Sequence, residues 1–265
     1  MPVTDAPAKA RALYEARRTR VPIPPFTDED PTLTMADGYA IQAELVPLLL
    51  ADGDRIVGHK VGLTSKAMQQ MVGVDAPDYG PVLASTVYRD GDPIPLDRFI
   101  QPRIEAEIVF VLGDRLAGPG VTVTQARAAI AGAVAGMEIV DSRIADWRIK
   151  LADTVADLAS NGAMATSSRI VPLDGFDARL VGMMLTRNGE LVDTGAGAAA
   201  LGDPVAVVAW LANVLGENGV ALEPGHLIMT GALHAAVPMT QGDVFRAEFD
   251  RLGPVTVRVA AGKDA

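Results

Sequence analysis

The distribution of short apolar segments along the chain constrains its fold more than any other feature. From residue 55 onward, runs rich in β-branched residues predict strands at 56–61, 108–112, 134–140, 182–186, 226–229, 244–249 and 255–259. Asn188-Gly189 lies between two of these runs and predicts a hairpin turn. Helices are predicted only at about 122–130 and from Asp203 to about 216, so strands and helices do not alternate regularly. This pattern disfavours an eight-unit βα barrel or a Rossmann sheet and favours an α+β fold.

The first 54 residues have a different character and predict helices. Residues 4–19 place Ala, Leu and Tyr on one side and Arg on the other, and residues 34–37 (TMAD) resemble a capping box that opens a second helix. Residues 21–30 carry three prolines and predict a loop, and Pro47 is expected to kink or end the second helix. We therefore predict a helical N-terminal segment, 1–54, and a strand-rich catalytic domain, 55–262.

Composition limits the chemistry that this chain can perform. Its 265 residues include no cysteine, which excludes disulfides, thiolate catalysis and cysteine-bound zinc. They include only three histidines. A bound metal would therefore take mainly oxygen ligands, which suits Mg²⁺ or Mn²⁺. The net charge is −10 and no block of Lys or Arg stands out, so we expect no nucleic-acid partner.

The apolar runs also bear on where the protein works. The N-terminal residues lack the apolar stretch of a signal peptide, and runs such as 206–211 are far shorter than the roughly 18–20 residues of a membrane span. We therefore expect a cytoplasmic protein with no membrane partner.

Three carboxylates interrupt apolar strand sequences. Glu105 and Glu107 are two residues apart in a predicted strand, so their side chains would lie on the same face, and Glu138 interrupts another apolar run. Like charges beside apolar sequence are costly unless a cation lies between them, so the three residues are candidate metal ligands. The alternatives are a solvated strand end for Glu105 and Glu107, and a surface ion pair between Glu138 and Arg143.

Lys60 and Asp78 are candidate catalytic groups. Lys60 lies inside an apolar strand pattern, where a partly buried ammonium needs a counter-charge and could bind a carboxylate or transfer a proton. The alternative is an exposed lysine on an edge strand. Asp78 lies in a segment of turn composition, 75–80 (DAPDYG), where capping of its own backbone is the alternative. The sequence contains no G-x-S-x-G elbow, P-loop or dinucleotide fingerprint.

Six motifs occur in the order seen in 2-keto-4-pentenoate hydratases of the fumarylacetoacetate hydrolase superfamily. They are 58–64 (GHKVGLT), 78–80 (DYG), 102–107 (PRIEAE), 138–143 (EIVDSR), 153–160 (DTVADLAS) and 228–231 (IMTG). The chain resembles this family over residues 33–259. The resemblance implies a mixed β-roll with a helical N-terminal segment. It also implies a metal-dependent hydratase that adds water to a 2-hydroxy-2,4-dienoate, giving a 4-hydroxy-2-oxo acid in the catabolism of aromatic or related ring-cleavage products. A homo-oligomer, either a pentamer or a decamer, is expected on the same ground.

Residue roles also follow from the resemblance. It implies Mg²⁺ or Mn²⁺ held by Glu105, Glu107 and Glu138, and proton transfer by Lys60 and Asp78. The residues that it implies for binding the small 2-oxo acid substrate are Leu63, Ser160, Thr230 and His234, with Ser160 and Thr230 near the substrate carboxylate. For His234 three interpretations stay open: an additional acid or base, a substrate selector, or an ordinary loop histidine.

Some segments depart from the hydratase pattern. The family's usual Asp-Asn-Ala-Ser is here 157–160 (DLAS), and Leu158 removes an amide donor and acceptor, which would favour a different substrate or weak hydratase activity. Residues 141–149 resemble the hydratases, whereas 191–202 and 228–237 share features with 4-oxalocrotonate decarboxylases. A decarboxylase, another C–C lyase or hydrolase on the same scaffold, and a repurposed or non-catalytic member are therefore the alternatives.

Overall fold

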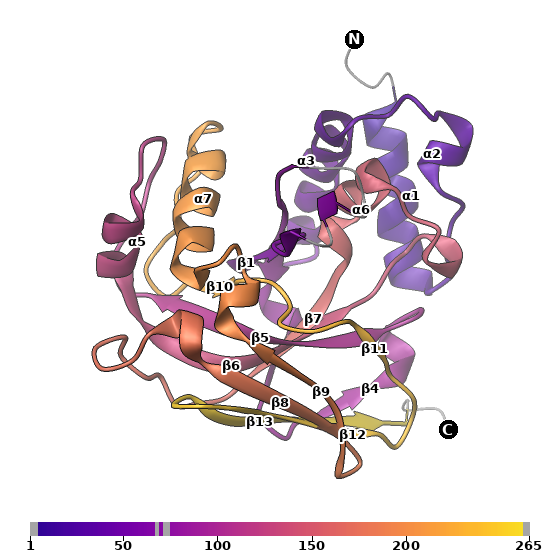
Figure 1. Ribbon diagram of the computed structural model, residues 1–265. Coiled ribbons are helices and arrows are strands. Elements are labelled where there is room, and N and C mark those ends of the chain that lie inside the picture. The colour runs from indigo at the N-terminus through magenta and orange to yellow at the C-terminus, as the bar shows by residue number, and fades with distance from the viewer. Residues whose placement is uncertain (1–4, 67–68, 71–74, 262–265) are drawn as a thin grey trace.

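Two β-sheets form the body of the molecule, and a layer of helices from the N-terminal part of the chain lies beside them (Figure 1). The computed structural model describes residues 5–66, 69–70 and 75–261. The first sheet has eight strands in the order β2-β1-β10-β5-β6-β7-β3, with β11 also paired to β5. The second has five strands in the order β4-β13-β12-β8-β9. Neither sheet closes on itself, and the fold is the expected α+β architecture.

The strands of the first sheet are β1 (Ile56–Gly62), β2 (Asp78–Leu83), β3 (Val87–Arg89), β5 (Arg103–Leu112), β6 (Ile130–Val140), β7 (Asn161–Thr166), β10 (Leu227–Met229) and β11 (Val237–Pro238). Those of the second are β4 (Pro93–Pro95), β8 (Gly182–Arg187), β9 (Glu190–Ala196), β12 (Val244–Phe249) and β13 (Gly253–Ala260). All seven predicted strand segments are strands. The predicted hairpin at Asn188-Gly189 joins β8 to β9, and both turn residues have positive φ.

The helices are α1 (Ala6–Thr19), α2 (Phe26–Glu29), α3 (Met35–Ala51), α5 (Val123–Ala129), α6 (Leu151–Ala156) and α7 (Pro204–Gly216). The capping box at Thr34 and the N-cap at Asp203 are both present, as predicted. The predicted loop 21–30 contains one helical turn, α2, whose Phe26 is buried. α1 and α3 pack with α6 around a hydrophobic cluster that includes Leu13, Ile41, Leu45 and Leu158.

Pro47 is expected from the sequence to kink or end the second helix. The prediction that it ends the helix is wrong, because α3 continues to Ala51. Pro47 is exposed, and it removes the hydrogen bond to the carbonyl of Ala43, which is exposed as well. Buried Leu45 and Leu49 lie on the other side and hold the helix against its neighbours. Tertiary packing therefore outweighs the lost backbone hydrogen bond.

Two local interpretations around β1 are also wrong. Asp78 is not in a turn: it begins β2, which runs antiparallel to β1 at the edge of the sheet. An edge strand tolerates Pro81, which lacks the N–H that an inner strand needs. Lys60 is not on an edge strand, because β1 lies between β2 and β10. Lys60 is also buried, with an exposed fraction of 5%.

Among the described residues, one segment, 197–216, is long and apolar enough to cross a membrane, and half of it is buried inside the molecule. Most of it is α7, which buries Val207, Val208 and Leu211 in the main hydrophobic core. The core helix of a globular protein passes the same test of length and composition, so this segment is weak evidence for a membrane span.

Candidate active site

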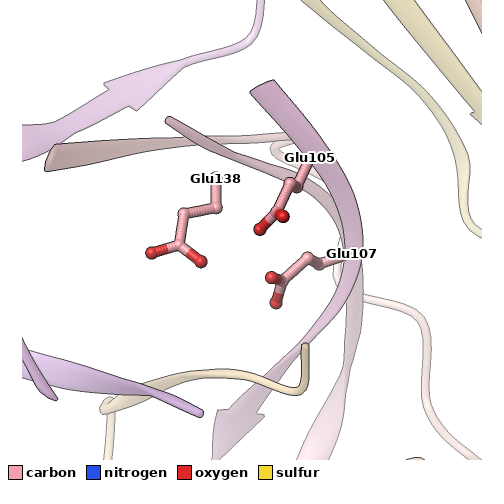
Figure 2. A group of neighbouring side chains, drawn as sticks. All are labelled: Glu105, Glu107 and Glu138. Carbon is pink, nitrogen blue, oxygen red and sulfur yellow. The ribbon is translucent and has the colours of Figure 1, made fainter. Parts of the chain in front are cut away.

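The pairing of β5 with β6 brings the three candidate carboxylates together. Glu105 lies directly opposite Glu138, and Glu107 lies opposite Gly136. Oxygen atoms of all three side chains lie within 4.8 Å of one another, and Figure 2 shows the side chains converging on a common space. Glu107 and Glu138 are buried, with exposed fractions of 1% and 0%, and Glu105 is partly buried. The alternative of a solvated strand end is therefore wrong.

The charge on these carboxylates is not compensated by the protein alone. Burial and the neighbouring Glu138 raise the pKa of Glu105 to about 7. Burial, Glu138 and Glu105 raise the pKa of Glu107 well above its usual value, and burial raises that of Glu138 although Lys60 opposes the shift. Three like charges in this largely buried cluster therefore favour either bound protons or a cation.

The hydrogen bonds at the site leave oxygens free for such a cation. The Gly231 N–H donates to Glu107 Oε2 at 2.9 Å, and Asn161 Nδ2 donates to Glu138 Oε1 at 2.9 Å. The opposite oxygens, Glu107 Oε1 and Glu138 Oε2, are buried without a hydrogen-bond partner. Buried polar atoms without partners are costly, and a set of carboxylate oxygens is what Mg²⁺ and Mn²⁺ take as ligands. The residues present therefore fit a divalent metal ion.

Lys60 approaches the carboxylates from β1. Its Nζ lies 3.6 Å from Glu138 Oε2 and donates to the Ala159 carbonyl at 2.8 Å. Although burial opposes the shift, the charges of Glu138 and Asp78 raise the pKa of Lys60 above its usual value. The surface ion pair considered between Glu138 and Arg143 is wrong, because Glu138 faces Lys60 and Arg143 pairs with Asp157.

Asp78 lies next to Lys60 because Gly62, its partner in the β1–β2 ladder, has no side chain. A Cβ atom on Gly62 would lie 2.3 Å from Asp78 Oδ1 and 3.0 Å from Lys60 Nζ. Asp78 Oδ1 is buried without a hydrogen-bond partner, and burial raises the pKa of Asp78 while Lys60 lowers it. The glycine therefore makes room for a carboxylate and an ammonium on one patch of the sheet.

Ser160 and Thr230 lie on two segments that contact this cluster. Ser160 ends a 3-10 turn, Leu158–Ser160, in which all three residues have positive φ, and the turn directs the Ala159 carbonyl toward Lys60. The Ser160 hydroxyl lies 3.0 Å from that of Thr154. Thr230 follows β10, precedes Gly231, and donates its hydroxyl to the Ile108 carbonyl at 2.9 Å. Roles for both in substrate binding stay predictions.

Leu63 and His234 lie on different segments and make different contacts. Leu63 directly follows β1 with a φ of 54°, and its carbonyl accepts from Gln69. His234 lies where the β5 edge has no strand partner, between β10 and β11: its Nε2 accepts the Ala106 N–H at 2.8 Å, and its Nδ1 lies 2.6 Å from the Ala235 carbonyl. With both ring nitrogens in main-chain contacts, the geometry favours the loop-histidine interpretation of His234.

The sequence alone did not single out Asn161 or Gly231 as parts of the site, and Gly62 entered only as one of the glycines of the 58–64 motif. Asn161 is a lone amide before small buried residues (NGAMAT), and this isolated polar group was the available signal. Asp157, which lies in the 153–160 motif, forms a buried ion pair with Arg143. Leu158 packs in the cluster between the N-terminal helices and is 1% exposed.

Known proteins match this chain over nearly its whole length. The family described as fumarylacetoacetate (FAA) hydrolase C-terminal matches residues 55–260. A 2-keto-4-pentenoate hydratase from Paraburkholderia xenovorans is 44% identical over 93% of this chain and 91% of the relative. A 2-hydroxypent-2,4-dienoate hydratase from Pseudomonas putida is 45% identical over 79% of this chain and 95% of the relative.

The same superfamily appears among solved structures. The 4-oxalocrotonate decarboxylase from Pseudomonas putida G7, complexed with magnesium and adipate, superimposes with a TM-score of 0.92. It is 37% identical, and the match covers 96% of this chain and 97% of the decarboxylase. On the family match and these relatives, the chain belongs to the fumarylacetoacetate hydrolase family.

Proposed function

We propose that this protein is a metal-dependent hydratase that adds water to a 2-hydroxy-2,4-dienoate and releases a 4-hydroxy-2-oxo acid, in the catabolism of aromatic or related ring-cleavage products. The observation that carries the proposal is the convergence of partly buried Glu105 with buried Glu107 and Glu138 beside Lys60. It is supported by hydratases 44% and 45% identical to the chain.

Glu105, Glu107 and Glu138 would hold Mg²⁺ or Mn²⁺ through their converging oxygens. The cation would supply Lewis-acid polarisation of the carboxylate and 2-oxo oxygens of a 2-oxo acid. Gly231 and Asn161 each fix one carboxylate oxygen by hydrogen bonding, and this leaves the other oxygen directed at the common space. Outer groups of this kind hold metal ligands in their working orientation.

Lys60 and Asp78 would move the protons of the reaction. Hydration of a dienol requires a proton at C5 of the substrate and the addition of water at C4. Lys60 and Asp78 would exchange these protons with a water molecule: the Lys60 ammonium is a hydrogen-bond donor beside Glu138, and Asp78 Oδ1, which is buried without a hydrogen-bond partner, would accept a proton from water. Ser160 and Thr230 would bind the substrate carboxylate, and Leu63 would complete the substrate-binding set. The main-chain contacts of His234 favour a role in holding β5 rather than the predicted contact with substrate.

The test follows the ultraviolet band of 2-hydroxypenta-2,4-dienoate with purified protein, with and without Mg²⁺ or Mn²⁺, and identifies the product by mass. We expect metal-dependent loss of the dienol band and a product heavier by one water. Lys60→Ala or Asp78→Asn should each lower turnover by roughly 10²–10⁴-fold. Lys66→Ala is the matched control, since Lys66 is exposed and contacts Gln69. Near-normal turnover in both active-site variants would rule out their assignment.

A second candidate is decarboxylation of a 2-oxo acid of the 4-oxalocrotonate type. The TM-score of 0.92 to a decarboxylase favours it, whereas the higher sequence identity of the hydratases favours hydration. Release of CO₂ from an unsaturated 2-oxo dicarboxylate, with no hydration of the dienoate, would select this candidate. A metal-loaded protein that changes neither substrate would point to a repurposed or non-catalytic member.

We also propose that the protein is a cytoplasmic homo-oligomer, and the family resemblance is the support for a pentamer or decamer. Sedimentation velocity of the purified protein measures the assembly directly. A monomer at micromolar concentration would contradict this part of the proposal.

A further inference from the structure

A cavity lined by arginines lies apart from the carboxylate site. It has a volume of about 140 Å³ and lies between the end of α1 and the segments that end β6 and begin β7. One water needs only roughly 10–15 Å³ on this scale, so the space admits a small molecule. Its charged lining residues are Arg17, Arg20, Arg98, Arg143 and Asp141. None of the predicted metal-binding, catalytic or substrate-binding residues lines it.

The positive charge in this cavity is only partly compensated. Arg143 forms a buried ion pair with Asp157 and lies 3.9 Å from Asp141. The carboxylate of Asp141 is further engaged by the main-chain N–H groups of Ile100 and Gln101. One acidic and four basic side chains therefore line a cavity in a protein whose net charge is −10.

The remaining guanidinium groups have few partners. Arg17 makes one long hydrogen bond, from Nη1 to the Asn161 carbonyl at 3.4 Å, and Arg98 donates to the Tyr88 hydroxyl at 2.6 Å. The two ion pairs found for the described residues that line this cavity are those of Arg143 with Asp157 and Asp141, and neither involves Arg17, Arg20 or Arg98. Burial and the nearby Arg143 lower the pKa of Arg17 to about 10, although Asp157 and Asp141 oppose the shift.

We propose that this cavity is a second ligand site, which binds the carboxylate or phosphate group of a small anion between Arg17, Arg20 and Arg98. A guanidinium presents its N–H groups in a planar fork that matches the oxygens of a carboxylate or phosphate. The three arginines come from the end of α1 and from the segment between β4 and β5, so one anion would join elements that are distant in sequence. The anion can come from solution or from an acidic side chain of a second copy of this chain.

The cavity adjoins the carboxylate site through the main chain. Arg17 contacts the carbonyl of Asn161, whose side chain donates to Glu138. Arg143 binds Asp157, which immediately precedes the turn that holds Lys60. Occupancy of the cavity would therefore stabilise the segment 157–161. Glu138 and Lys60 both depend on this segment for a hydrogen-bond partner. This inference does not rest on the proposed hydratase activity.

The test is calorimetric titration of the metal-loaded protein with inorganic phosphate and, separately, with succinate, at low ionic strength. We expect saturable binding that weakens as NaCl is added. Arg17→Gln and Arg20→Gln should each weaken it at least about tenfold. Arg11→Gln, an exposed arginine on the same helix, is the matched control. Arg20 is exposed, so its variant should fold even if the Arg17 variant does not.

Sedimentation velocity distinguishes the two sources of the anion. If a second copy supplies the carboxylate, the assembled wild type binds no added phosphate, and Arg20→Gln dissociates the assembly. Either binding of a free anion or this dissociation supports the site. The inference is overturned if the wild type binds neither anion and Arg20→Gln leaves the assembly unchanged. It is also overturned if the wild type binds phosphate and Arg20→Gln binds it as tightly as the wild type and Arg11→Gln do.

Discussion

At the scale of single residues, the spacing of charges in apolar sequence predicted the acidic cluster, but not the neighbours of each side chain. Glu105 and Glu107 could be placed on one face because the side-chain period of a strand is two. Their meeting with Glu138 depends on the register between β5 and β6, and the sequence does not display that register. Asn161 and Gly231 bind the carboxylates through contacts 23 and 124 residues apart in sequence. Such partners are invisible to any local pattern.

His234 provides a test of positioning rather than proton transfer. Its Nε2 accepts the N–H of Ala106, which lies between Glu105 and Glu107 on β5. We expect His234→Ala to weaken Mn²⁺ binding by about tenfold, which is the lower end of the loss of metal affinity seen when a residue that positions metal ligands is removed. The shape of the pH–rate profile should stay unchanged. His234→Gln keeps an acceptor and should recover part of the affinity.

Manganese binding by these variants can be measured by electron paramagnetic resonance. The control is His226→Ala, since His226 also accepts a main-chain N–H, from Glu223, but not on β5. If His234→Ala removed one limb of the pH–rate profile while metal binding stayed normal, His234 would be an acid or base after all.

Leu158 provides a test of the departure from the family's Asn. Its side chain packs in the hydrophobic cluster of the N-terminal helices, so an amide there would be buried in an apolar environment. We expect Leu158→Asn to lower the free energy of unfolding by about 1–3 kcal/mol, reduced somewhat because Asn tolerates the left-handed backbone better. Turnover should stay near that of the wild type, and Leu158→Met is the volume-matched control. A large gain in turnover from Leu158→Asn would show that the amide acts on the substrate.

At the scale of elements, apolar runs rich in β-branched residues identified strands, and small-residue strands were missed. β2 (DYGPVL) and β7 (NGAMAT) contain Gly, Pro, Asn and Ala, which locally favour turns or helices, and sheet pairing overrides these preferences. These strands carry Asp78 and Asn161, so the missed elements are those that complete the site. The division of the chain at residue 54 stays a prediction, and α6 and Leu158 of the later part pack with the N-terminal helices.

The β8–β9 hairpin and the start of β12 are joined by Asp243. Its carboxylate accepts from Thr240 and Asn188 and pairs with Arg187 at 2.8 Å. Although burial opposes the shift, these hydrogen bonds lower the pKa of Asp243 from 3.8 to about 2. Because the folded pKa is the lower one, the carboxylate stabilises the fold above pH 3.8, and this contribution is lost as the pH falls from 3.8 toward 2.

We expect Asp243→Asn to lower the free energy of unfolding at pH 7 by about 1–2 kcal/mol, a value reduced for solvent screening. Urea unfolding at pH 7 and at pH 3 measures the difference, which should shrink at the lower pH. Asp250→Asn is the control, since Asp250 and its partner Arg251 are both exposed. An equal loss at both pH values would assign the effect to packing rather than charge.

At the scale of the whole molecule, the fold gathers acidic groups at some cost to its own stability. β1, β5 and β6 and the segment after β10 each bring a charged or polar group to one buried space, and the N-terminal helices hold the Leu158–Ser160 turn from outside. Apolar cores normally exclude unpaired carboxylates, because a buried charge without a partner is strongly destabilising. The cost is consistent with a site that is completed only when a cation binds.

Removal of metal should therefore reverse the order of stability of the wild type and the Glu107→Gln variant. In EDTA, Glu107→Gln should unfold at a higher temperature than the wild type, because it removes one of three repelling carboxylates. We expect a gain of at least about 1 kcal/mol, since one unit of pKa shift corresponds to about that amount. The amide oxygen of Gln can still accept the Gly231 N–H that now binds Glu107.

With Mg²⁺ at 100 times its Kd, the wild type should gain about 2.7 kcal/mol and become the more stable form. Differential scanning calorimetry in EDTA and in Mg²⁺ measures both orders, and Glu44→Gln, at an exposed position on α3, is the control. If the wild type unfolded at the same temperature in both solutions, and Glu107→Gln unfolded no later in EDTA, the three glutamates would be stabilised by protons alone and the metal assignment would fail.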